Sequence, residues 1–162
     1  MRIGQGYDVH PLRPGRALVL GGVTIEHPLG LDGHSDADVL THAVASALLG
    51  SLALGDLGTH FPATDARWKD ASSLELLAAV MAMVRSRGYE LANCDATVIA
   101  EAPRLAPHIG PIRARLAQTL GVDVGVVSVQ ATTHERLGSL GRAEGIAATA
   151  VVLVVPKAAN GG

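Results

Sequence analysis

An almost continuous run of alanine and valine near the end of the chain, Ala147–Val155, constrains the fold more than any other segment. A strand that is apolar on both sides suits a central or interface position in a sheet, because neither face favours contact with water. We therefore expect a final strand over about residues 146–155. Alanine, valine and leucine must fill the core, which favours close packing of helices on the sheet, because the only aromatic residues are Tyr7, Phe61, Trp68 and Tyr89.

Three further strands and a hairpin are predicted from the apolar pattern and the turn residues. Residues 2–10 form a strand that Pro11 ends, and Gly21-Gly22 joins the two short arms of a hairpin. Residues 28–33 are expected to be a loop. The remaining strands are expected at residues 95–100 and 124–131.

Three helices are predicted from capping residues and helical spacing. The first begins at an N-cap at Ser35 or Asp36 and stops near Gly50. The second begins at a capping box, Ser72–Glu75, and ends at Gly88. The third spans residues 109–120. Residues 50–71 are too broken for regular structure, and they form either a flap over a site or a plain surface loop.

This order of elements predicts one α+β domain over residues 1–156. We expect a mixed four-stranded sheet with helices packed on one face, plus a small hairpin. Residues 157–162 are expected to form a disordered tail.

The composition argues against several kinds of partner. The formal net charge is −2 and aromatic residues are few, so neither a nucleic acid nor a membrane surface is expected to bind. Cys94 is the only cysteine, and the N-terminus shows no signal-peptide pattern. No apolar run reaches the ~20 residues that a membrane-spanning helix needs. We therefore expect a cytoplasmic protein.

The polar cluster that carries most chemical information combines Gly6–His10, His34–Asp38 and His42. Side chains alternate along a strand, so Asp8 and His10 leave the same face, and His42 lies early in the following helix. One carboxylate and two imidazoles, with a position left open, are typical of a catalytic zinc site. Two alternatives remain: the Asp-x-His pair caps a turn, and His42 is a hydrogen-bonded core histidine.

Several polar loops follow predicted strands and suit phosphate groups. Thr132 and Thr133 offer hydroxyl and backbone N–H donors, and the glycine-rich loop around Arg142 suits an anion. Glu135 is a hard oxygen ligand that matches Mg²⁺ or Mn²⁺ better than zinc. With Asp8, His10 and His42, these residues point to phosphoryl chemistry assisted by two divalent ions.

From Met1 to about Val155, the sequence resembles the 2-C-methyl-D-erythritol 2,4-cyclodiphosphate synthases of the non-mevalonate isoprenoid pathway. Each shared motif is short, but all of them occur in order, which makes the combined match specific. The motifs are Gly6–His10, His34–Asp38, Ala53–Gly58, Phe61-Pro62, Ala131–Thr133 and Gly141–Gly145.

The resemblance implies a reaction. The substrate would be 4-diphosphocytidyl-2-C-methyl-D-erythritol 2-phosphate, whose own 2-phosphate attacks the β-phosphorus, releases CMP and closes a cyclic diphosphate. A phosphate monoester is already anionic near neutral pH, so no general base is needed. The difficulty is to bring two anions together, and metal ions with fixed donors meet it.

The resemblance also assigns residues to roles. Asp8, His10 and His42 would hold Zn²⁺, and Glu135 would help to hold a second divalent cation, Mg²⁺ or Mn²⁺. His34 and Thr133 would be catalytic, stabilising the transition state. The remaining substrate contacts would come from Ser35, from Asp56, Leu57, Gly58, Phe61, Pro62, Ala63, Thr64 and Asp65, from Ala100, Glu101, Ala102, Pro103, Arg104, Leu105 and Ala106, and from Thr132, His134, Glu135 and Arg142.

The resemblance further implies a homotrimer around a threefold axis, with active sites between subunits. One chain would supply the metal ligands and its neighbour the cytidine turn and the threonines. Three residues depart from the family pattern. Arg104 replaces a common lysine, Ala63 replaces a frequent acidic residue, and Ser139 stands where a large aromatic residue can face the trimer cavity.

Two other functions are compatible with parts of this pattern. A non-catalytic trimer that binds nucleotides or isoprenoid phosphates would keep the loop Gly138–Gly145 but would not need an open zinc position. A metal-dependent phosphohydrolase would hold a water molecule where the 2-phosphate should lie. The release of CMP from substrates with and without the 2-phosphate separates these functions.

Overall fold

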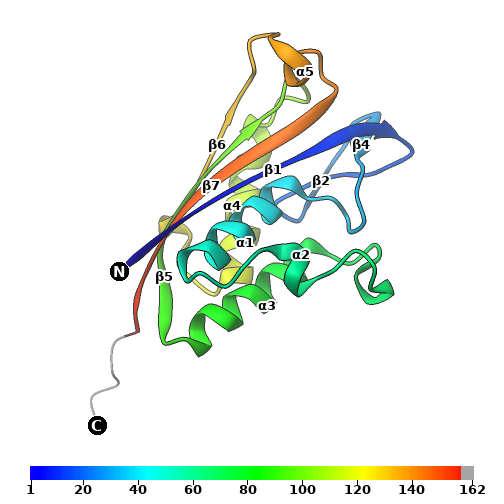
Figure 1. Cartoon of the computed structure of the whole chain (residues 1–162). Helices are drawn as coiled ribbons and strands as arrows, with labels where there is room; N and C mark the ends of the chain where they lie inside the picture. Colours follow the sequence, from blue (N-terminus) through cyan, green and yellow to red (C-terminus); the bar gives the residue numbers. More distant parts are fainter. Residues whose placement is uncertain (158–162) are drawn as a thin grey trace.

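The structure, a computed structural model, describes residues 1–157, and residues 158–162 lie outside the described part. One layer is a five-stranded mixed sheet in the order β4-β1-β7-β5-β6, and a two-stranded hairpin, β2-β3, stands beside it (Figure 1). Only the β5-β6 pair is parallel. The strands are β1 Arg2–Pro14, β2 Leu18–Leu20, β3 Val23–Ile25, β4 Leu29–Leu31, β5 Tyr89–Ile99, β6 Val127–Thr132 and β7 Gly145–Pro156.

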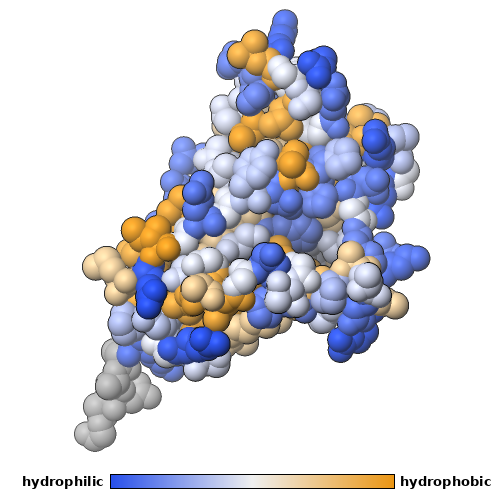
Figure 2. Space-filling model, viewed as in Figure 1, coloured by the Kyte–Doolittle hydropathy of each residue, from blue (hydrophilic) through white to orange (hydrophobic). Residues whose placement is uncertain are grey.

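Helices cover one face of this sheet, as predicted, with α1 lying directly on β1 and β7. The longer helices are α1 Val39–Ser51, α3 Ser73–Ser86 and α4 Ile109–Leu120, and the short ones are α2 Leu57–His60 and α5 Gly138–Gly141. Alternate side chains of the other face are exposed, including Ile3, Tyr7, Val9 and Val151. The apolar cluster near the N-terminus in Figure 2 lies where β1 begins with the exposed Met1 and Ile3.

The final strand has the central position that its sequence predicted. β7 pairs antiparallel with β1 on one side and with β5 on the other. Its alanines and valines that point toward the helices are completely buried, for example Ala148, Val152 and Val154. These small side chains let α1 approach the sheet closely.

Two glycines in β1 bring α1 still closer. A Cβ atom added to Gly4 would overlap the backbone carbonyl of Ala47, and one added to Gly6 would overlap that of Ala43. Both positions lie on the face that carries Asp8 and His10, so the glycines place helix α1 directly against the strand that holds these two side chains. Glycine is required here because no side chain fits between the two backbones.

The sheet has five strands rather than the predicted four. Residues 29–31, predicted as a loop, pair with the end of β1, and β1 continues through Pro11 to Pro14. Proline removes only a donor, and the Pro11 carbonyl still accepts a hydrogen bond from the Asp32 N–H at 3.0 Å. Up to Pro11, β1 pairs with β7, and from Leu12 it pairs with β4. The strand therefore continues where the sequence predicted its end.

One predicted helix start differs in position, and the capping box predicted for another helix does not form. Helix α1 begins after Asp38, not after Ser35 or Asp36, and the Asp38 side chain accepts from the Thr41 N–H at 3.0 Å. Asp38 also accepts from the N–H groups of Gly21 and Gly22, which ties the hairpin to the helix. Burial raises the pKa of Asp38, although the hydrogen bonds from Thr41, Gly22 and Gly21 oppose this shift.

Helix α3 starts where predicted, but the capping box does not form, because the Ser72 side chain makes no cap hydrogen bond.

Strand β5 begins earlier than predicted, at Tyr89, and a 3₁₀ turn over Val124–Val126 delays the start of β6 to Val127. After the end of α1 at Ser51, the broken segment 50–71 contains only α2 and a 3₁₀ turn over Ala66–Trp68. The predicted tail falls outside the described residues except for Lys157, whose N–H donates to the Gly88 carbonyl at 2.8 Å.

Candidate metal and substrate site

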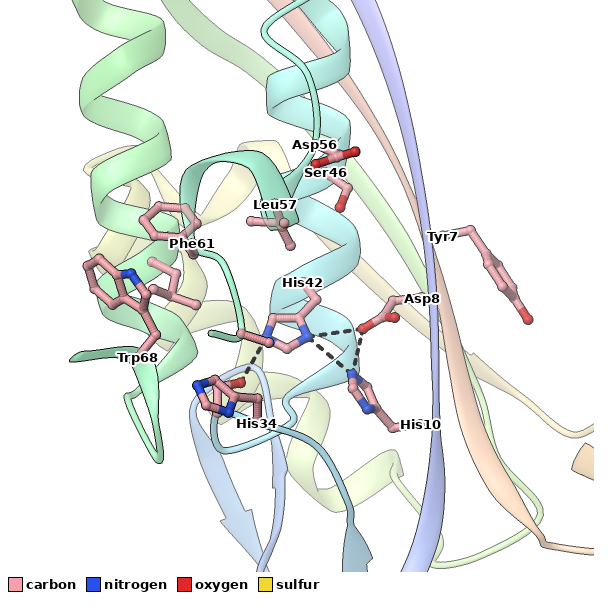
Figure 3. Close-up of a pocket in the computed structure, with 14 residues that line it drawn as sticks. Tyr7, Asp8, His10, His34, His42, Ser46, Asp56, Leu57, Phe61 and Trp68 are labelled. Carbon is pink, nitrogen blue, oxygen red and sulfur yellow. Dashed lines mark hydrogen bonds and ion pairs between the residues drawn. The ribbon is translucent and has the colours of Figure 1, made fainter. Parts of the chain in front are cut away.

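The structure brings Asp8, His10 and His42 together (Figure 3). The Asp8 Oδ2 atom lies 3.0 Å from His10 Nε2 and 3.0 Å from His42 Nδ1, and these two nitrogens are 3.3 Å apart. Asp8 and His10 come from alternate positions of β1, and His42 comes from the first turns of α1. We refer to these three residues as the metal triad.

The geometry contradicts the turn-cap alternative, and it leaves His42 hydrogen-bonded, as the core-histidine alternative requires, but beside two other ligand atoms. The Asp8–His10 pair lies within a long strand, so it caps no turn. The Nδ1 atom of His42 points at the Asp8 carboxylate and the other imidazole, not into the apolar core. Among the described residues, this is the one group of three His, Cys, Asp or Glu side chains with ligand atoms within 4.8 Å of one another.

Each histidine of the triad uses its second ring nitrogen for a separate partner. His10 Nδ1 lies 2.9 Å from the Asp32 carbonyl oxygen, which can only accept, so this nitrogen carries hydrogen and leaves Nε2 toward the triad. His42 Nε2 lies 2.8 Å from Ser73 Oγ and 3.2 Å from Ser35 Oγ. Ligand histidines held in this way are typical of metal sites.

The negative charge of Asp8 favours a cation at the triad. Burial raises the pKa of Asp8, but hydrogen bonds from His10 and His42 and the attraction of their charge outweigh it, and the pKa lies well below its ordinary value. Burial lowers the pKa of His10, and the hydrogen bond and charge of Asp8 more than offset this, so its pKa is raised. A cation must displace a proton from His10, so metal affinity will fall as the pH drops through this raised pKa.

One oxygen and two nitrogen donors fit a divalent transition metal and leave a coordination position open. The carboxylate and the two imidazoles meet around one point, and the residues that line their cavity include no lysine or arginine. The three donors therefore fit the predicted divalent metal.

The triad lines a cavity of about 350 Å³ between β1, α1 and the segment 50–71. Seven of the other predicted residues line it: His34, Ser35, Asp56, Leu57, Gly58, Phe61 and Ala63. Pro62, Thr64 and Asp65 are not among the lining residues, and Asp65 instead pairs with Arg67, with 2.6 Å between Oδ2 and Nη2. The structure thus places part of the segment 50–71 against the cavity, as the flap interpretation expected.

The sequence interpretation missed four lining residues: Tyr7, Ser46, Trp68 and Leu76. Ser46 could have been found, because it follows His42 by one helical turn. Trp68 packs edge-on against Phe61, with 5.1 Å between ring centroids. No local pattern links Trp68 to the triad, so only the tertiary structure identifies it.

Arg16 was also missed, and it shapes the loop that presents His34 and Ser35. Its guanidinium donates to the carbonyl oxygens of Leu31 at 3.2 Å, Gly33 at 3.2 Å and Ser35 at 2.9 Å. A planar group with several donors is well suited to bind successive carbonyl groups. Arg16 therefore holds the loop between β4 and α1 in one conformation.

A second pocket of about 470 Å³ lies beyond the ends of β5 and β6. The pocket is lined by Ala100, Glu101, Pro103, Arg104, Leu105, Ala106, Ala131, Thr132, Thr133 and Glu135. Three predicted residues of this region, Ala102, His134 and Arg142, are not among the lining residues. Arg142 instead pairs with Glu144, with 2.6 Å between Nε and Oε1.

Glu101 joins the two loops that form this second pocket. Its carboxylate accepts from the backbone N–H groups of His134 at 2.9 Å and Arg136 at 3.1 Å. The Thr133 hydroxyl donates to Glu135 at 3.1 Å, so these two predicted residues are neighbours.

The two pockets are separate within one chain. The strand registers place His10 opposite Ile146, Ala147 opposite Ile99, and Ile99 opposite Thr132. Three strand spacings, roughly 14 Å, therefore separate β1 from the end of β6. A single chain does not bring Thr133 and Glu135 to its own metal triad.

No helix among residues 1–157 is long and apolar enough to cross a membrane.

The single cysteine, Cys94, is buried in β5, and burial together with the charge of Asp95 raises its thiol pKa to about 12. Cys94 is therefore a packing residue and not a nucleophile.

Comparison with known proteins identifies the family of the chain. The sequence matches the YgbB family over residues 1–155. It is 59% identical over 162 residues to the 2-C-methyl-D-erythritol 2,4-cyclodiphosphate synthase of Moorella thermoacetica, covering 100% of this chain and 99% of that protein. The synthase of Synechococcus elongatus is 56% identical over 154 residues, with 95% and 96% covered.

The fold also matches a solved structure of IspF from Plasmodium falciparum in complex with CDP. The TM-score is 0.85 at 33% identity, and the match covers 96% of each chain. These relatives confirm the predicted resemblance and the prediction of an enzyme of the cyclodiphosphate synthase class. The chain belongs to the YgbB family.

Proposed function

We propose that this enzyme converts 4-diphosphocytidyl-2-C-methyl-D-erythritol 2-phosphate to 2-C-methyl-D-erythritol 2,4-cyclodiphosphate and CMP. The observation that carries the proposal is the metal triad, which opens into a cavity lined by His34, Ser35 and five residues of the segment 56–63. The names of the curated relatives support the same reaction, and the CDP bound to the Plasmodium relative supports a cytidine nucleotide as ligand.

Asp8, His10 and His42 would hold Zn²⁺, which polarises the phosphorus under attack and neutralises charge on the diphosphate when bound. The residues of this chain would do the rest. His34 and Ser35 would donate to phosphate oxygens, and Asp56 and Leu57 would orient the methylerythritol group, so that the 2-phosphate lies in line with the β-phosphorus. The bond to the CMP oxygen breaks as the new phosphorus–oxygen bond forms, and CMP leaves as an anion.

The second pocket would receive the cytidine and the diphosphate. Backbone groups of Ala100–Ala106 would bind the base, with Arg104 close to the nucleotide phosphate. Thr132, Thr133 and Glu135 would line the diphosphate, with Thr133 stabilising the transition state and Glu135 helping to hold a second divalent cation, Mg²⁺ or Mn²⁺. Six of the predicted contact residues line neither pocket in this chain: Ala102, His134, Arg142, Pro62, Thr64 and Asp65.

We further propose that the enzyme is a homotrimer in which each active site joins the metal triad of one chain to the second pocket of a neighbour. The separation of the two pockets within one chain supports this arrangement. The exposed apolar residues on the uncovered face of the sheet, Ile3, Tyr7, Val9 and Val151, supply a surface that assembly would bury.

Purified enzyme with Zn²⁺ and Mg²⁺ should release CMP from the full substrate and should form the cyclic diphosphate in equal amount. The analogue that lacks the 2-phosphate is the control, and it should yield no CMP because the nucleophile is missing. Equal CMP release from both compounds would show that water attacks and that the enzyme is a phosphohydrolase. Nucleotide binding without CMP release from either compound would favour a binding protein.

A further inference from the structure

A chain of polar side chains lies behind the metal triad, on the side of His42 away from Asp8. Ser73 is completely buried at the first position of α3, and its Oγ atom is 2.8 Å from His42 Nε2. The same Oγ atom makes a very short hydrogen bond to the Asp36 carboxylate, whose other oxygen accepts from the Ser73 N–H at 3.0 Å. None of these contacts follows from sequence proximity, because Ser73 is 31 residues from His42 and 37 from Asp36.

The direction of these hydrogen bonds is fixed by the number of protons available. A serine hydroxyl has one hydrogen, and the Asp36 carboxylate can only accept, so the hydroxyl donates to Asp36. The lone pairs of Ser73 Oγ then face His42, and His42 Nε2 must carry the hydrogen that it donates. With hydrogen on Nε2, a neutral imidazole would present its lone pair to a cation at Nδ1, the atom that without a cation lies in the hydrogen bond with Asp8.

We infer that Asp36 and Ser73 are positioning residues that hold the His42 ring in the orientation and tautomer required for metal binding. This inference rests on the proposed metal site. Asp36 polarises the Ser73 hydroxyl, and the polarised oxygen draws the Nε2 hydrogen of His42. Asp36 is itself fixed by its backbone N–H, which donates to the Ala71 carbonyl at 3.1 Å.

Ser35 gives His42 a weaker alternative partner. Its Oγ atom lies 3.2 Å from His42 Nε2 and 3.5 Å from Ser73 Oγ. Ser35 also accepts from the Ala37 N–H at 3.2 Å, and no carboxylate within residues 1–157 bonds to its hydroxyl. Loss of Ser73 is therefore expected to weaken the orientation of His42 without abolishing it.

The test uses Ser73→Ala, Asp36→Asn and the matched control Ser72→Ala in the full chain. Ser72 is adjacent to Ser73 and opens the same helix, but its side chain makes no cap hydrogen bond. Zinc affinity is measured by competition with a chromophoric chelator. We expect Ser73→Ala to weaken zinc binding about 10- to 100-fold, Asp36→Asn to weaken it less, because its amide oxygen still accepts, and Ser72→Ala to leave it unchanged.

A spectroscopic measurement separates positioning from general damage. In the zinc-loaded wild-type enzyme, ¹⁵N-edited NMR of the histidine rings should show a slowly exchanging Nε2–H on His42. This resonance should move upfield and exchange faster in Ser73→Ala, and it should shift less in Asp36→Asn. Ser72→Ala should leave it in place. If Ser73→Ala does not fold, Asp36→Asn provides the same two measurements.

Unchanged zinc affinity and an unchanged Nε2–H resonance in both Ser73→Ala and Asp36→Asn would overturn the inference while leaving the metal site intact. A wild-type enzyme that fails to bind zinc would instead contradict the proposed function. The two failures are therefore distinguishable.

Discussion

The metal triad and the second pocket differ in how firmly one chain fixes them. The triad side chains are mostly buried, with 13% of His42, 19% of His10 and 27% of Asp8 exposed, and each histidine has a second partner behind it. The loop after β6 is exposed, and Glu135 and Arg136 both adopt left-handed backbone conformations with φ of 50° and 61°. One chain thus assembles the metal triad alone but leaves the second pocket open to solvent, as the proposed site between subunits requires.

The largest effect should come from His42→Ala. Removal of one of three ligands should abolish stoichiometric zinc binding and reduce CMP release by at least about 1,000-fold, because metal stabilisation of the transition state is worth several kcal/mol. Metal analysis and turnover measure these two losses. The circular dichroism spectrum should stay unchanged, since His42 lies at the cavity and not in the apolar core. Full turnover in this variant would remove His42 from the ligand set.

Mixing two inactive variants should restore activity if the two pockets meet only between chains. His42→Ala disables the triad, and Thr133→Ala disables the second pocket. After unfolding and refolding together in equal amounts, about one quarter of the sites in a trimer should combine an intact triad with an intact neighbouring pocket. Turnover should therefore rise to roughly a quarter of the wild-type value. No recovery in a mixture shown to contain mixed oligomers would mean that each chain completes its own site.

A smaller effect is expected from Gly6→Ala, which tests how the fold builds the triad. The added methyl group would meet the backbone of Ala43, so β1 and α1 must separate and His42 must move away from Asp8. We expect a loss of about 1–3 kcal/mol in the free energy of unfolding, together with weaker zinc binding. Denaturant unfolding and chelator competition measure both.

The matched control for Gly6→Ala is Gly110→Ala in α4, where an added Cβ atom meets nothing within 4 Å. This change should stabilise the chain slightly, by about 0.5–1 kcal/mol, because alanine favours a helix more than glycine. Equal effects of the two substitutions would show that the contact between β1 and α1 does not determine the site.

The amino-acid sequence by itself determined the members of the metal triad and the central position of β7. Local rules were sufficient for two of these points: alternation along a strand places Asp8 and His10 on one face, and a strand rich in alanine and valine favours a position between two other strands. The predicted spans of α4 and of the β2-β3 hairpin were confirmed for the same reason, since their glycines stand where left-handed turns occur. The place of His42 in the triad also needed the resemblance to the family.

Only the tertiary structure decided what surrounds those residues. Pro11 does not end β1, because its carbonyl finds a partner in the loop before α1, and Asp38 rather than Ser35 or Asp36 caps that helix, because the hairpin donates to it. Ser73 reaches His42, and the second pocket stands three strands away from the triad, through contacts between segments far apart in sequence. Such contacts depend on how the helices and the sheet pack against each other. A local pattern of residues does not specify which distant segments will meet.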